Sequence, residues 1–219
     1  FWQHYDTIYA AKDYDHEVEV ILPFIGHANT LLEIGCGTGE HTKRLAPHFR
    51  GTCAIDMDYD AIQIARTKRK PYSVLVHTAL EDFQGSDFGA AVALFNVTHA
   101  LPTQYWLNRF MRAVYGRLTT DGVFIFDCWN GEAVLADPPK EEWRTNPETG
   151  TKIHLIPKLD RDNRTVRVRM EVEVKGESFH SHIDHRLWTI GEYRAALQGA
   201  GFKDIAVARW MQPAIAATD

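Results

Sequence analysis

The chain has 219 residues, which suits one medium-sized domain with a modest insert and is too short for two full-size catalytic domains. Hydrophobic residues make up 45% and charged residues 24%, so the composition excludes a wholly disordered, coiled-coil or low-complexity chain. The 24 basic and 29 acidic side chains give a net charge of −5, so we expect no nucleic-acid partner.

Signals for membranes and secretion are missing from the sequence. No run reaches the roughly 18 apolar residues that a membrane helix needs, and residues 1–15 carry charges where a signal peptide would be apolar. We therefore expect a cytoplasmic protein without a membrane partner. Cys36, Cys53 and Cys128 are odd in number and widely spaced, which predicts free thiols. Because the first residue is Phe1 rather than Met, we expect further residues before it.

Five short apolar runs are predicted to be strands, with helices between them. The runs are TLLEI, GTCAID, SVLVH, AAVALF and VFIFD, in chain order from residue 30. Helices are expected from about Glu40, from Tyr59 and over 102–118, and the last one ends in a turn at 119–122. Because the strands are continuous apolar runs, they indicate a parallel sheet with helices on both faces.

The pattern changes after Asp127. A polar stretch covers 137–151, and strict alternation of apolar and polar residues begins after it. Over 165–175, apolar residues share one face and charged residues the other, which predicts a half-exposed antiparallel strand. With 152–159 before it and 178–188 after it, this strand predicts a three-stranded antiparallel insert after the fifth strand.

The C-terminal part is predicted to return to the helix and strand pattern. A Thr-x-x-Glu capping box at Thr189 opens a helix, which ends at the glycines of 199–201. A strand is expected at 203–210, as the sixth strand of the main sheet.

A glycine-rich turn at 35–39 connects the first expected strand to a helix. Glycines there let the backbone adopt positive φ and approach a ligand closely. Glu40 stands where the dinucleotide fingerprint has its third glycine, which disfavours NAD, and Glu33 suits a ligand with an ammonium group. Asp56, at the end of the second strand, can accept both hydroxyls of a ribose. Together these residues predict an adenosine ligand that also carries a cation.

With a strand before it, a helix after it and an acid at this distance, the turn resembles that of class I S-adenosylmethionine-dependent methyltransferases. The resemblance runs from about Tyr5 to Trp210 and implies an α/β fold with a Rossmann-like, mostly parallel sheet flanked by helices. A glycine turn in another α/β fold remains the alternative. The resemblance implies S-adenosylmethionine as cofactor, with these binding residues: Tyr14, Glu33, Gly35, Cys36, Gly37, Gly39, Asp56, Met57, Ala79, Leu80 and Phe95.

Three of these positions are assigned by the resemblance in detail. It implies that Met57 lies against the adenine and that Phe95, which ends the fourth strand, packs near the methionine part. Ala79 stands where the family usually has an acid for the adenine amine, so backbone groups near Leu80, or the side chain of Asp82, would replace that acid.

The N-terminal segment resembles that of sugar-nucleotide N-methyltransferases, including N,N-dimethyltransferases of deoxyaminosugar pathways. Tyr5-Asp6, Tyr9 and Lys12-Asp13-Tyr14 carry this resemblance, and so does the β insert, which lies over the active site in those enzymes. Tyr5, a candidate catalytic residue, and Tyr9, a candidate substrate-binding residue, would belong to a lid over the sulfonium. The alternative is an aromatic stripe that docks an N-terminal helix.

Methyl transfer from a sulfonium requires alignment of the nucleophile and exclusion of water more than side-chain chemistry. An amine must react in its neutral form, so a nearby histidine can take its proton. His99 follows the fourth strand, whose carboxyl end faces the expected cofactor, and is the candidate base or substrate anchor. The alternative is a loop histidine without a role.

Five side chains would share one face if 180–188 forms a strand: His180, His182, Asp184, Arg186 and Trp188. They could ligate a metal, form a polar surface, or line the acceptor cavity with Arg186 on a substrate phosphate or carboxylate. The third possibility fits the expected fold best. We therefore expect no metal and the following substrate residues besides Tyr9: Trp129, Asn130, His182, Arg186 and Trp188.

The class also implies a sheet that ends in a hairpin, whose last strand lies beside the fifth. Only nine residues follow Trp210, so we expect the chain to stop short of this seventh strand. We expect one domain over 1–219. Its parts are N-terminal lid helices at 1–30, a cofactor-binding core at 31–136, the insert at 151–188 and a C-terminal helix and strand at 189–219.

The sequence therefore predicts a methyltransferase that acts on a small-molecule acceptor, as a monomer or homodimer. The expected reaction is N-methylation of an amino sugar nucleotide or a similar amine. An O- or C-methyltransferase of a small metabolite is one alternative, and a catalytically silent S-adenosylmethionine-binding module is the other.

Overall fold

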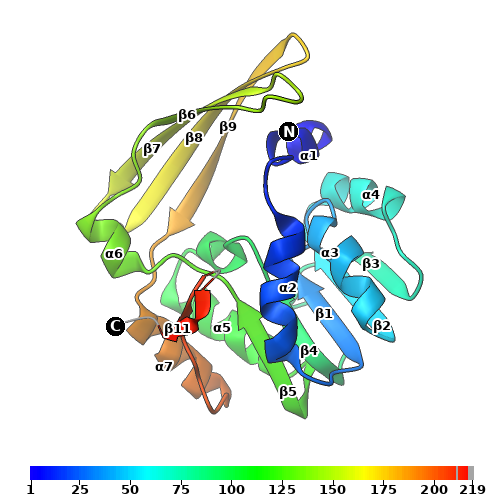
Figure 1. Cartoon of the computed structure of the whole chain (residues 1–219). Coiled ribbons are helices and arrows are strands. Elements are labelled where there is room, and N and C mark those ends of the chain that lie inside the picture. Colours follow the sequence, from blue (N-terminus) through cyan, green and yellow to red (C-terminus); the bar gives the residue numbers. More distant parts are fainter. Residues whose placement is uncertain (211, 217–219) are drawn as a thin grey trace. The chain divides into compact units, whose positions relative to one another are not determined.

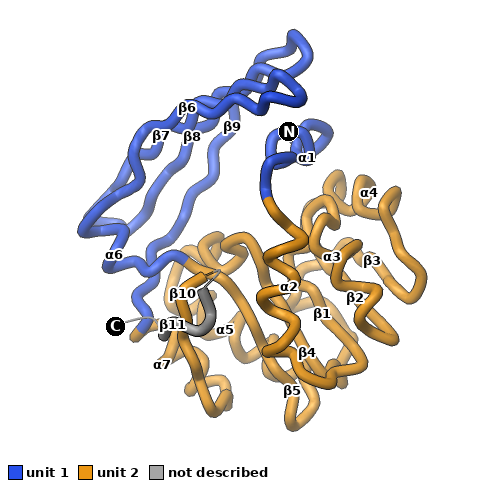
Figure 2. The backbone as a smooth tube through the Cα atoms, in the orientation of Figure 1, with its two compact units in different colours: residues 1–12, 129–190 blue, residues 13–128, 191–219 orange. Residues whose placement is uncertain are grey.

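The computed structural model describes residues 1–210 and 212–216 (Figure 1). The chain divides into two compact units (Figure 2). Unit 1 combines residues 1–12 with residues 129–190, and unit 2 combines residues 13–128 with residues 191–219. The two N-terminal helices, α1 (Trp2–Ile8) and α2 (Tyr14–Ile25), thus belong to different units.

Unit 2 contains a five-stranded parallel sheet in the order β3-β2-β1-β4-β5 (Figure 1). Its strands are β1 (Thr30–Ile34), β2 (Gly51–Asp56), β3 (Ser73–His77), β4 (Phe88–Ala93) and β5 (Leu118–Phe126). The helical elements of this unit, besides α2, are α3 (Glu40–Leu45), η1 (Ala46–His48), α4 (Tyr59–Thr67), η2 (Val97–Ala100), α5 (Gln104–Tyr115) and α7 (Ile190–Ala200). The predicted α/β fold with a parallel sheet is confirmed.

The core of unit 2 lies between the central strands and their helices. Val18 and Ile21 of α2 pack on Leu31 of β1 and on Val92 of β4. Phe110, on the buried stripe of α5, contacts Phe124 of β5. Because the central strands are buried on both faces, polar side chains in them must have a specific role.

The turn predicted at 119–122 is wrong, because these residues belong to β5. Strand β5 pairs Leu118 with Phe88 and then Val123 with Ala90, so the register shifts between the two pairs. β5 is the last strand in the sheet order, and an edge strand tolerates such an irregularity because only one neighbour must be matched.

The expectation of a sixth strand at 203–210 in the main sheet is also wrong. Only β10 (Ala208–Arg209) is a strand there, and it pairs with β11 (Gln212–Ala216) in a separate two-stranded antiparallel sheet. Asp204 has φ +52, which interrupts the extended backbone that a longer strand would need. The expected lack of a seventh strand falls partly on residues 211 and 217–219, which lie outside the described residues.

Unit 1 contains a four-stranded antiparallel sheet in the order β6-β7-β8-β9. The strands are β6 (Glu142–Thr145), β7 (Lys152–Asp160), β8 (Thr165–Val174) and β9 (Glu177–Arg186), and the unit also contains α6 (Gly131–Ala136). The expected three strands are present, but the insert has β6 as a fourth. All four residues of β6 are exposed, so this edge strand lacks the apolar alternation that reveals a strand in sequence.

The two faces of β8 differ as predicted. Met170 and Val172 are buried with Ile153 of β7 and Ile8 of α1, so the N-terminal helix packs on the apolar face of the sheet. The charged residues of β8, such as Arg169, are exposed on the other face. Unit 1 therefore has its own small core.

Two further expectations concern the cysteines and membrane helices. Cys36, Cys53 and Cys128 are free thiols, as predicted. Among the residues that the structure describes, no helix has the length and apolar character to span a membrane.

Candidate functional site

The glycine turn after β1 has the backbone geometry that its sequence predicts. Gly35, Gly37 and Gly39 have φ values of +71, +53 and +81, which residues with a Cβ rarely adopt. A Cβ on Gly35 would lie 2.6 Å from Val97 Cγ2, so no larger residue fits without a shift. The Gly35 N–H donates to the carbonyl of Ile55, over 2.8 Å, and this bond ties the turn to β2.

Asp56, the last residue of β2, is attached to this turn. Its Oδ2 accepts the N–H of Gly37 over 2.7 Å, and its Oδ1 accepts the N–H of Asp58 over 2.9 Å. Burial raises the pKa of Asp56, and these two N–H groups act in the opposite direction. Because each carboxylate oxygen has more than one acceptor direction, Asp56 can still accept hydrogen bonds from two ribose hydroxyls.

Glu33 is a buried carboxyl beside the turn. The residue is only 2% exposed, and its Oε2 has no hydrogen-bond partner among the described residues. Burial raises the pKa of Glu33 to about 8, the charge of Asp56 adds to this, and the Thr42 hydroxyl opposes it. Burial makes the charged form of this carboxyl costly and leaves Oε2 without a partner, so the position fits a ligand that brings a positive charge.

Glu40, the first residue of α3, is held by three cations. Its carboxylate lies 2.6 Å from Lys43, 2.6 Å from Arg44 and 2.8 Å from Lys68. Burial opposes its ionisation, but hydrogen bonds from these three side chains outweigh burial and lower the pKa of Glu40 to about 2. The three cations neutralise this carboxylate, so the sequence argument against a dinucleotide rests on the side chain of Glu40 standing where a glycine is expected, and not on its charge.

Tyr14 begins α2 and packs against the helix that follows the glycine turn. Its ring meets the ring of His41 edge-on, with 4.9 Å between centroids, and the Arg44 guanidinium lies 5.2 Å from the Tyr14 centroid. The sequence argument missed a buried pair beside it, in which His41 Nε2 lies 2.8 Å from Glu17 Oε2. No local signal predicts this pair, because α2 and α3 are joined through an entire strand.

The residues expected to meet the adenine come together at the carboxyl ends of β2 and β3. Asp56 pairs with His77 in the sheet, and the N–H of Thr78 donates to the Asp56 carbonyl over 2.9 Å. Met57 therefore lies beside the start of the loop after β3, and it is 77% exposed. The Ala79 carbonyl, in that loop, accepts the N–H of Asp82 over 3.2 Å.

The loop thus turns tightly after Ala79. The side chain of Leu80 is buried, whereas that of Asp82 is exposed. Two groups were expected to replace the acid that Ala79 lacks, and the structure distinguishes them. The backbone near Leu80 is held in place by the turn, whereas the side chain of Asp82 is exposed to solvent.

Phe95 and Asn96 follow β4 in an unusual backbone conformation. Their φ values are +69 and +62, and a left-handed conformation is costly for a bulky residue such as phenylalanine. The Asn96 N–H donates to Asp127 Oδ1 over 2.8 Å, which fastens this bend to the end of β5. His99 follows within η2, is 1% exposed, and donates its backbone N–H to the Asn96 carbonyl over 3.0 Å. His99 is thus a buried residue of a constrained segment.

A second anchor of η2 was missed from the sequence. The hydroxyls of Thr98 and Tyr193 lie 2.7 Å apart, and Tyr193 belongs to α7. The Tyr193 side chain also hydrogen-bonds the Cys128 thiol, and burial raises the pKa of both groups, that of Cys128 to about 12. Residues so far apart in the chain are joined only by the tertiary fold.

Tyr5 and Tyr9 lie together in unit 1. Their ring centroids are 4.7 Å apart, and Tyr5 also contacts Trp2 at 5.1 Å. The Tyr9 hydroxyl lies 3.7 Å from the sulfur of Met170, and burial raises the pKa of Tyr9. Both tyrosines are therefore part of an aromatic cluster formed by α1 and its C-cap residue, and Tyr9 packs against the apolar face of the antiparallel sheet.

His182 lies on the other face of that sheet. It pairs with Arg169, whereas Met170, the partner of Tyr9, points to the apolar face. Asp184 is bound to Arg167 by two bonds of 2.6 and 2.7 Å. Within residues 1–210, no three His, Cys, Asp or Glu side chains are grouped so that they could hold a metal ion.

The remaining expected substrate residues have partners within unit 1. The Arg186 guanidinium lies 5.0 Å from the ring centroid of Trp188, which is buried. Trp129 stacks on His185 at 4.6 Å, and burial lowers the pKa of His185 to about 4. Asn130 caps α6, because its side chain accepts the N–H of Glu132 over 3.0 Å.

Comparison with known proteins shows which proteins this chain resembles. Residues 32–124 match a family model described as a methyltransferase domain. The chain is 27% identical over 209 residues to a dTDP-3-amino-3,6-dideoxy-alpha-D-glucopyranose N,N-dimethyltransferase of Streptomyces fradiae, and the match covers 90% of this chain and 81% of that protein.

Two further similarities cover nearly the whole chain. A dTDP-3-amino-3,4,6-trideoxy-alpha-D-glucopyranose N,N-dimethyltransferase of Streptomyces venezuelae is 27% identical, with 91% of this chain and 88% of that protein covered. The structure of S-adenosylmethionine-bound CalS10, an amino pentose methyltransferase from Micromonospora echinaspora, is 22% identical with a TM-score of 0.80, covering 97% and 94% of the two chains. These matches cover a larger share of the chain than either unit contains, so the similarity includes the β insert.

Proposed function

We propose that this chain, which is an S-adenosylmethionine-dependent methyltransferase, N-methylates the amine of an amino sugar carried by a nucleotide. The observation that carries this proposal is the extent of the similarity. The relatives named as dTDP-aminosugar N,N-dimethyltransferases match this chain over 90% and 91% of its length. A match confined to residues 32–124 would support methyl transfer but no particular acceptor.

We assign cofactor binding to residues of unit 2. Asp56 accepts the ribose hydroxyls, Glu33 balances the positive charge of the ligand, and the glycine turn allows close approach of the backbone. Met57 and the backbone near Leu80 meet the adenine. When bound, S-adenosylmethionine supplies an electrophilic methyl group on a sulfonium. The orphaned Oε2 of Glu33 supports this assignment, since the ligand is cationic.

We assign acceptor chemistry to His99 and to the tyrosines of α1. The acceptor amine must be neutral when it attacks, and the His99 imidazole takes its proton. Tyr5 and Tyr9 of unit 1 stay predicted lid residues, whose role would be to exclude the water that competes with the acceptor. The constrained backbone from Phe95 to His99 supports the role of His99, because strained segments are retained where a side chain must be held in one position.

A methyl-transfer assay with a panel of acceptors tests the proposal. The panel contains dTDP-linked 3-amino and 4-amino sugars, the corresponding hydroxy sugars, and simple amines, with S-adenosylhomocysteine as the measured product. We expect turnover on an amino sugar nucleotide and N-methylated product by mass spectrometry. Turnover only on hydroxy sugars would instead support an O-methyltransferase, and binding of the cofactor without turnover on any acceptor would support a silent module.

Variants of two histidines test the assigned base. His99→Gln should lower kcat by roughly 100-fold or more while the cofactor affinity stays unchanged, since a general base contributes about 100- to 10,000-fold. His27→Gln is the matched control, because His27 is an exposed histidine of the same unit. An unchanged kcat for His99→Gln would contradict the assignment.

A further inference from the structure

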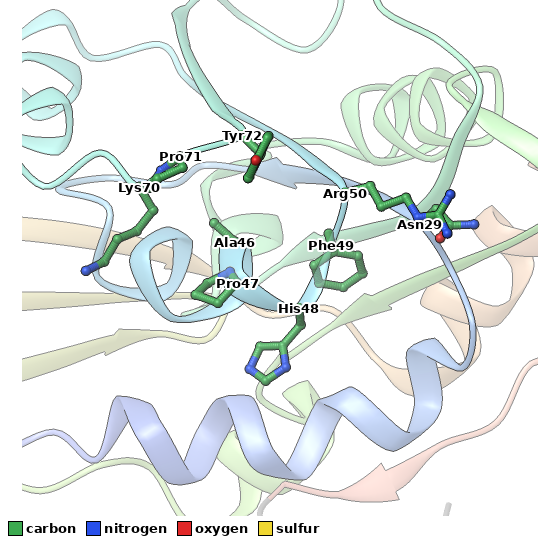
Figure 3. Close-up of a pocket in the computed structure, with 9 residues that line it drawn as sticks. All are labelled: Asn29, Ala46, Pro47, His48, Phe49, Arg50, Lys70, Pro71 and Tyr72. Carbon is green, nitrogen blue, oxygen red and sulfur yellow. The ribbon is translucent and has the colours of Figure 1, made fainter.

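The edge of the parallel sheet where the strands begin carries a cavity that methyl transfer does not use (Figure 3). Its volume is about 650 Å³, within the range of roughly 300–1,000 Å³ that is typical of small-molecule sites. It is lined by Asn29 before β1, residues 46–50 before β2, and residues 70–72 before β3. The glycine turn and Asp56 lie at the opposite edge, where β1 and β2 end.

The charge of this cavity is positive. Arg50 and Lys70 line it, and no acidic residue does. Arg50 and Lys70 are exposed, and within the described residues neither side chain has an ion pair. Figure 3 shows the two side chains at opposite ends of the cavity, with Tyr72 between them. On a chain of net charge −5, unneutralised cations around a cavity favour an anionic ligand.

Tyr72 adds an aromatic surface held in a strained conformation. It has φ +64, which is a true outlier for a bulky side chain, and it is nevertheless 79% exposed. Its carbonyl accepts the N–H of Thr52 over 2.9 Å, so pairing with β2 holds the backbone in place. An exposed ring kept at this cost beside a cavity offers a face for a planar ligand.

We propose that this cavity is a second binding site, for a nucleoside phosphate. The phosphate meets the Arg50 guanidinium and the Asn29 amide at one end of the cavity, and the base stacks on the ring of Tyr72. Arginine suits this role because its planar group of donors matches phosphate oxygens.

A neighbouring cavity shows that the charge is specific to this site. It has a volume of about 400 Å³, shares Asn29 with the first, and is lined by Asp87 and Asp121. Two carboxylates would repel a phosphate, so the neighbouring cavity is unsuited to the same ligand. Asp121→Asn is therefore a control variant that alters charge close to the proposed site without removing any of its proposed contacts.

Calorimetric titration with ADP tests the site, with the intact chain kept saturated in S-adenosylhomocysteine so that the first site cannot take the adenosine. We expect ADP binding that depends on Arg50 and Tyr72, besides any ADP held where the nucleotide of the proposed acceptor binds, and an affinity that falls as salt is added. Arg50→Gln should weaken ADP binding roughly tenfold or more, as expected for loss of a hydrogen bond to a charged group. Tyr72→Asn should weaken it severalfold, because asparagine tolerates the left-handed backbone but lacks the ring.

Three outcomes would overturn the proposal. The first is no detectable binding of ADP, and the second is binding that neither Arg50→Gln nor Tyr72→Asn alters, since the ligand would then lie elsewhere. The third outcome uses inorganic pyrophosphate as the probe. If pyrophosphate binds as tightly as ADP, and if Tyr72→Asn leaves ADP binding unchanged, the cavity is a simple anion site. Asp121→Asn should leave the affinity for ADP unchanged or slightly improved.

Discussion

Each unit of this chain contains one main sheet, five-stranded in unit 2 and four-stranded in unit 1, and the two sheets hold their polar groups differently. In unit 2 the central strands are buried on both faces, and the carboxylate of Asp56 is held by backbone N–H groups of Gly37 and Asp58. In unit 1 one face is buried, and polar side chains on the other hold one another, as Arg167 holds Asp184. A group fixed by backbone has a position set by the fold, whereas an exposed ion pair contributes about 0–1 kcal/mol and rearranges easily.

This difference matters for the two steps of the proposed function, which are binding of the cofactor and binding of the acceptor. The proposed cofactor residues follow strands of the parallel sheet that are buried on both faces, whereas the sheet of unit 1 has one open face. Substitutions in the buried parts of either unit should therefore lower stability, and substitutions on the open face should be tolerated.

The largest loss of stability is expected in the core of unit 1. Met170 is 2% exposed and touches Tyr9, so Met170→Ala should lower the free energy of unfolding by about 2–5 kcal/mol. Arg169→Ala, at the adjacent position on the open face, should change it by no more than about 0.5 kcal/mol. Urea unfolding measures both, and equal losses would contradict the assignment of the two faces.

Two glycines compare the turn of unit 2 with a hairpin of unit 1. Gly35→Ala combines φ +71 with the 2.6 Å contact to Val97, and it should cost about 2–4 kcal/mol of unfolding free energy. Gly176 has φ +81 with nothing within 4 Å of its missing Cβ, so Gly176→Ala should cost only the conformational strain of about 1–2 kcal/mol. Thermal or urea unfolding that shows no difference would mean that the turn has room for a Cβ.

Glu33 should make the stability of the chain depend on pH. Its pKa is raised from 4.5 to about 8 by burial, so the unfolded chain ionises first as pH rises. Its contribution to stability is therefore complete below about pH 4.5 and is lost as pH rises to about 8. Glu40 has the opposite sign: its pKa is lowered from 4.5 to about 2, so its contribution to stability is complete above about pH 4.5 and is lost as pH falls to about 2.

The measurement is urea unfolding of the native chain and of Glu33→Gln at several values between pH 5 and 8. The native chain should lose stability relative to the variant across this range. A constant difference between the two would show that Glu33 ionises at its ordinary pKa.

The smallest effect is expected at the anchor of η2. Tyr193→Phe removes the hydroxyl 2.7 Å from that of Thr98 and should cost about 1 kcal/mol of unfolding free energy. It should also lower kcat more than it changes the cofactor affinity, because η2 carries His99. Tyr115→Phe is the control, since Tyr115 is exposed in α5. Equal kcat values for the two variants would contradict a positioning role for Tyr193.

The elements of unit 2 were largely predictable because their signals are local. The bounds of β1, β2 and β3 equal the apolar runs TLLEI, GTCAID and SVLVH. Asp56 could be predicted as part of the site because a parallel strand-helix-strand unit places the ends of β1 and β2 side by side. The hydrogen bond from Gly37 to Asp56 confirms that the two ends meet.

The features that the sequence did not predict depend on contacts that no local pattern encodes. Strand β6 is exposed throughout and forms only because β7 offers it an edge. The Thr98–Tyr193 and Glu17–His41 contacts join elements that are distant in the chain. The alternation of residues is enough to infer the face of the sheet on which His182 lies. It does not predict which face α1 covers, because that depends on how the segment before residue 13 packs.

We propose that unit 2 holds the cofactor through the end of β2. The most direct test is calorimetric titration of S-adenosylmethionine into the native chain, Asp56→Ala, Asp60→Ala and Tyr9→Phe. We predict that Asp56→Ala weakens binding by about 1.5–3 kcal/mol, or roughly 10- to 150-fold, because two hydrogen bonds to a charged group are lost. Asp60, an exposed acid of α4, and Tyr9 of unit 1 should leave the affinity unchanged when replaced. An unaltered affinity for Asp56→Ala would contradict the account.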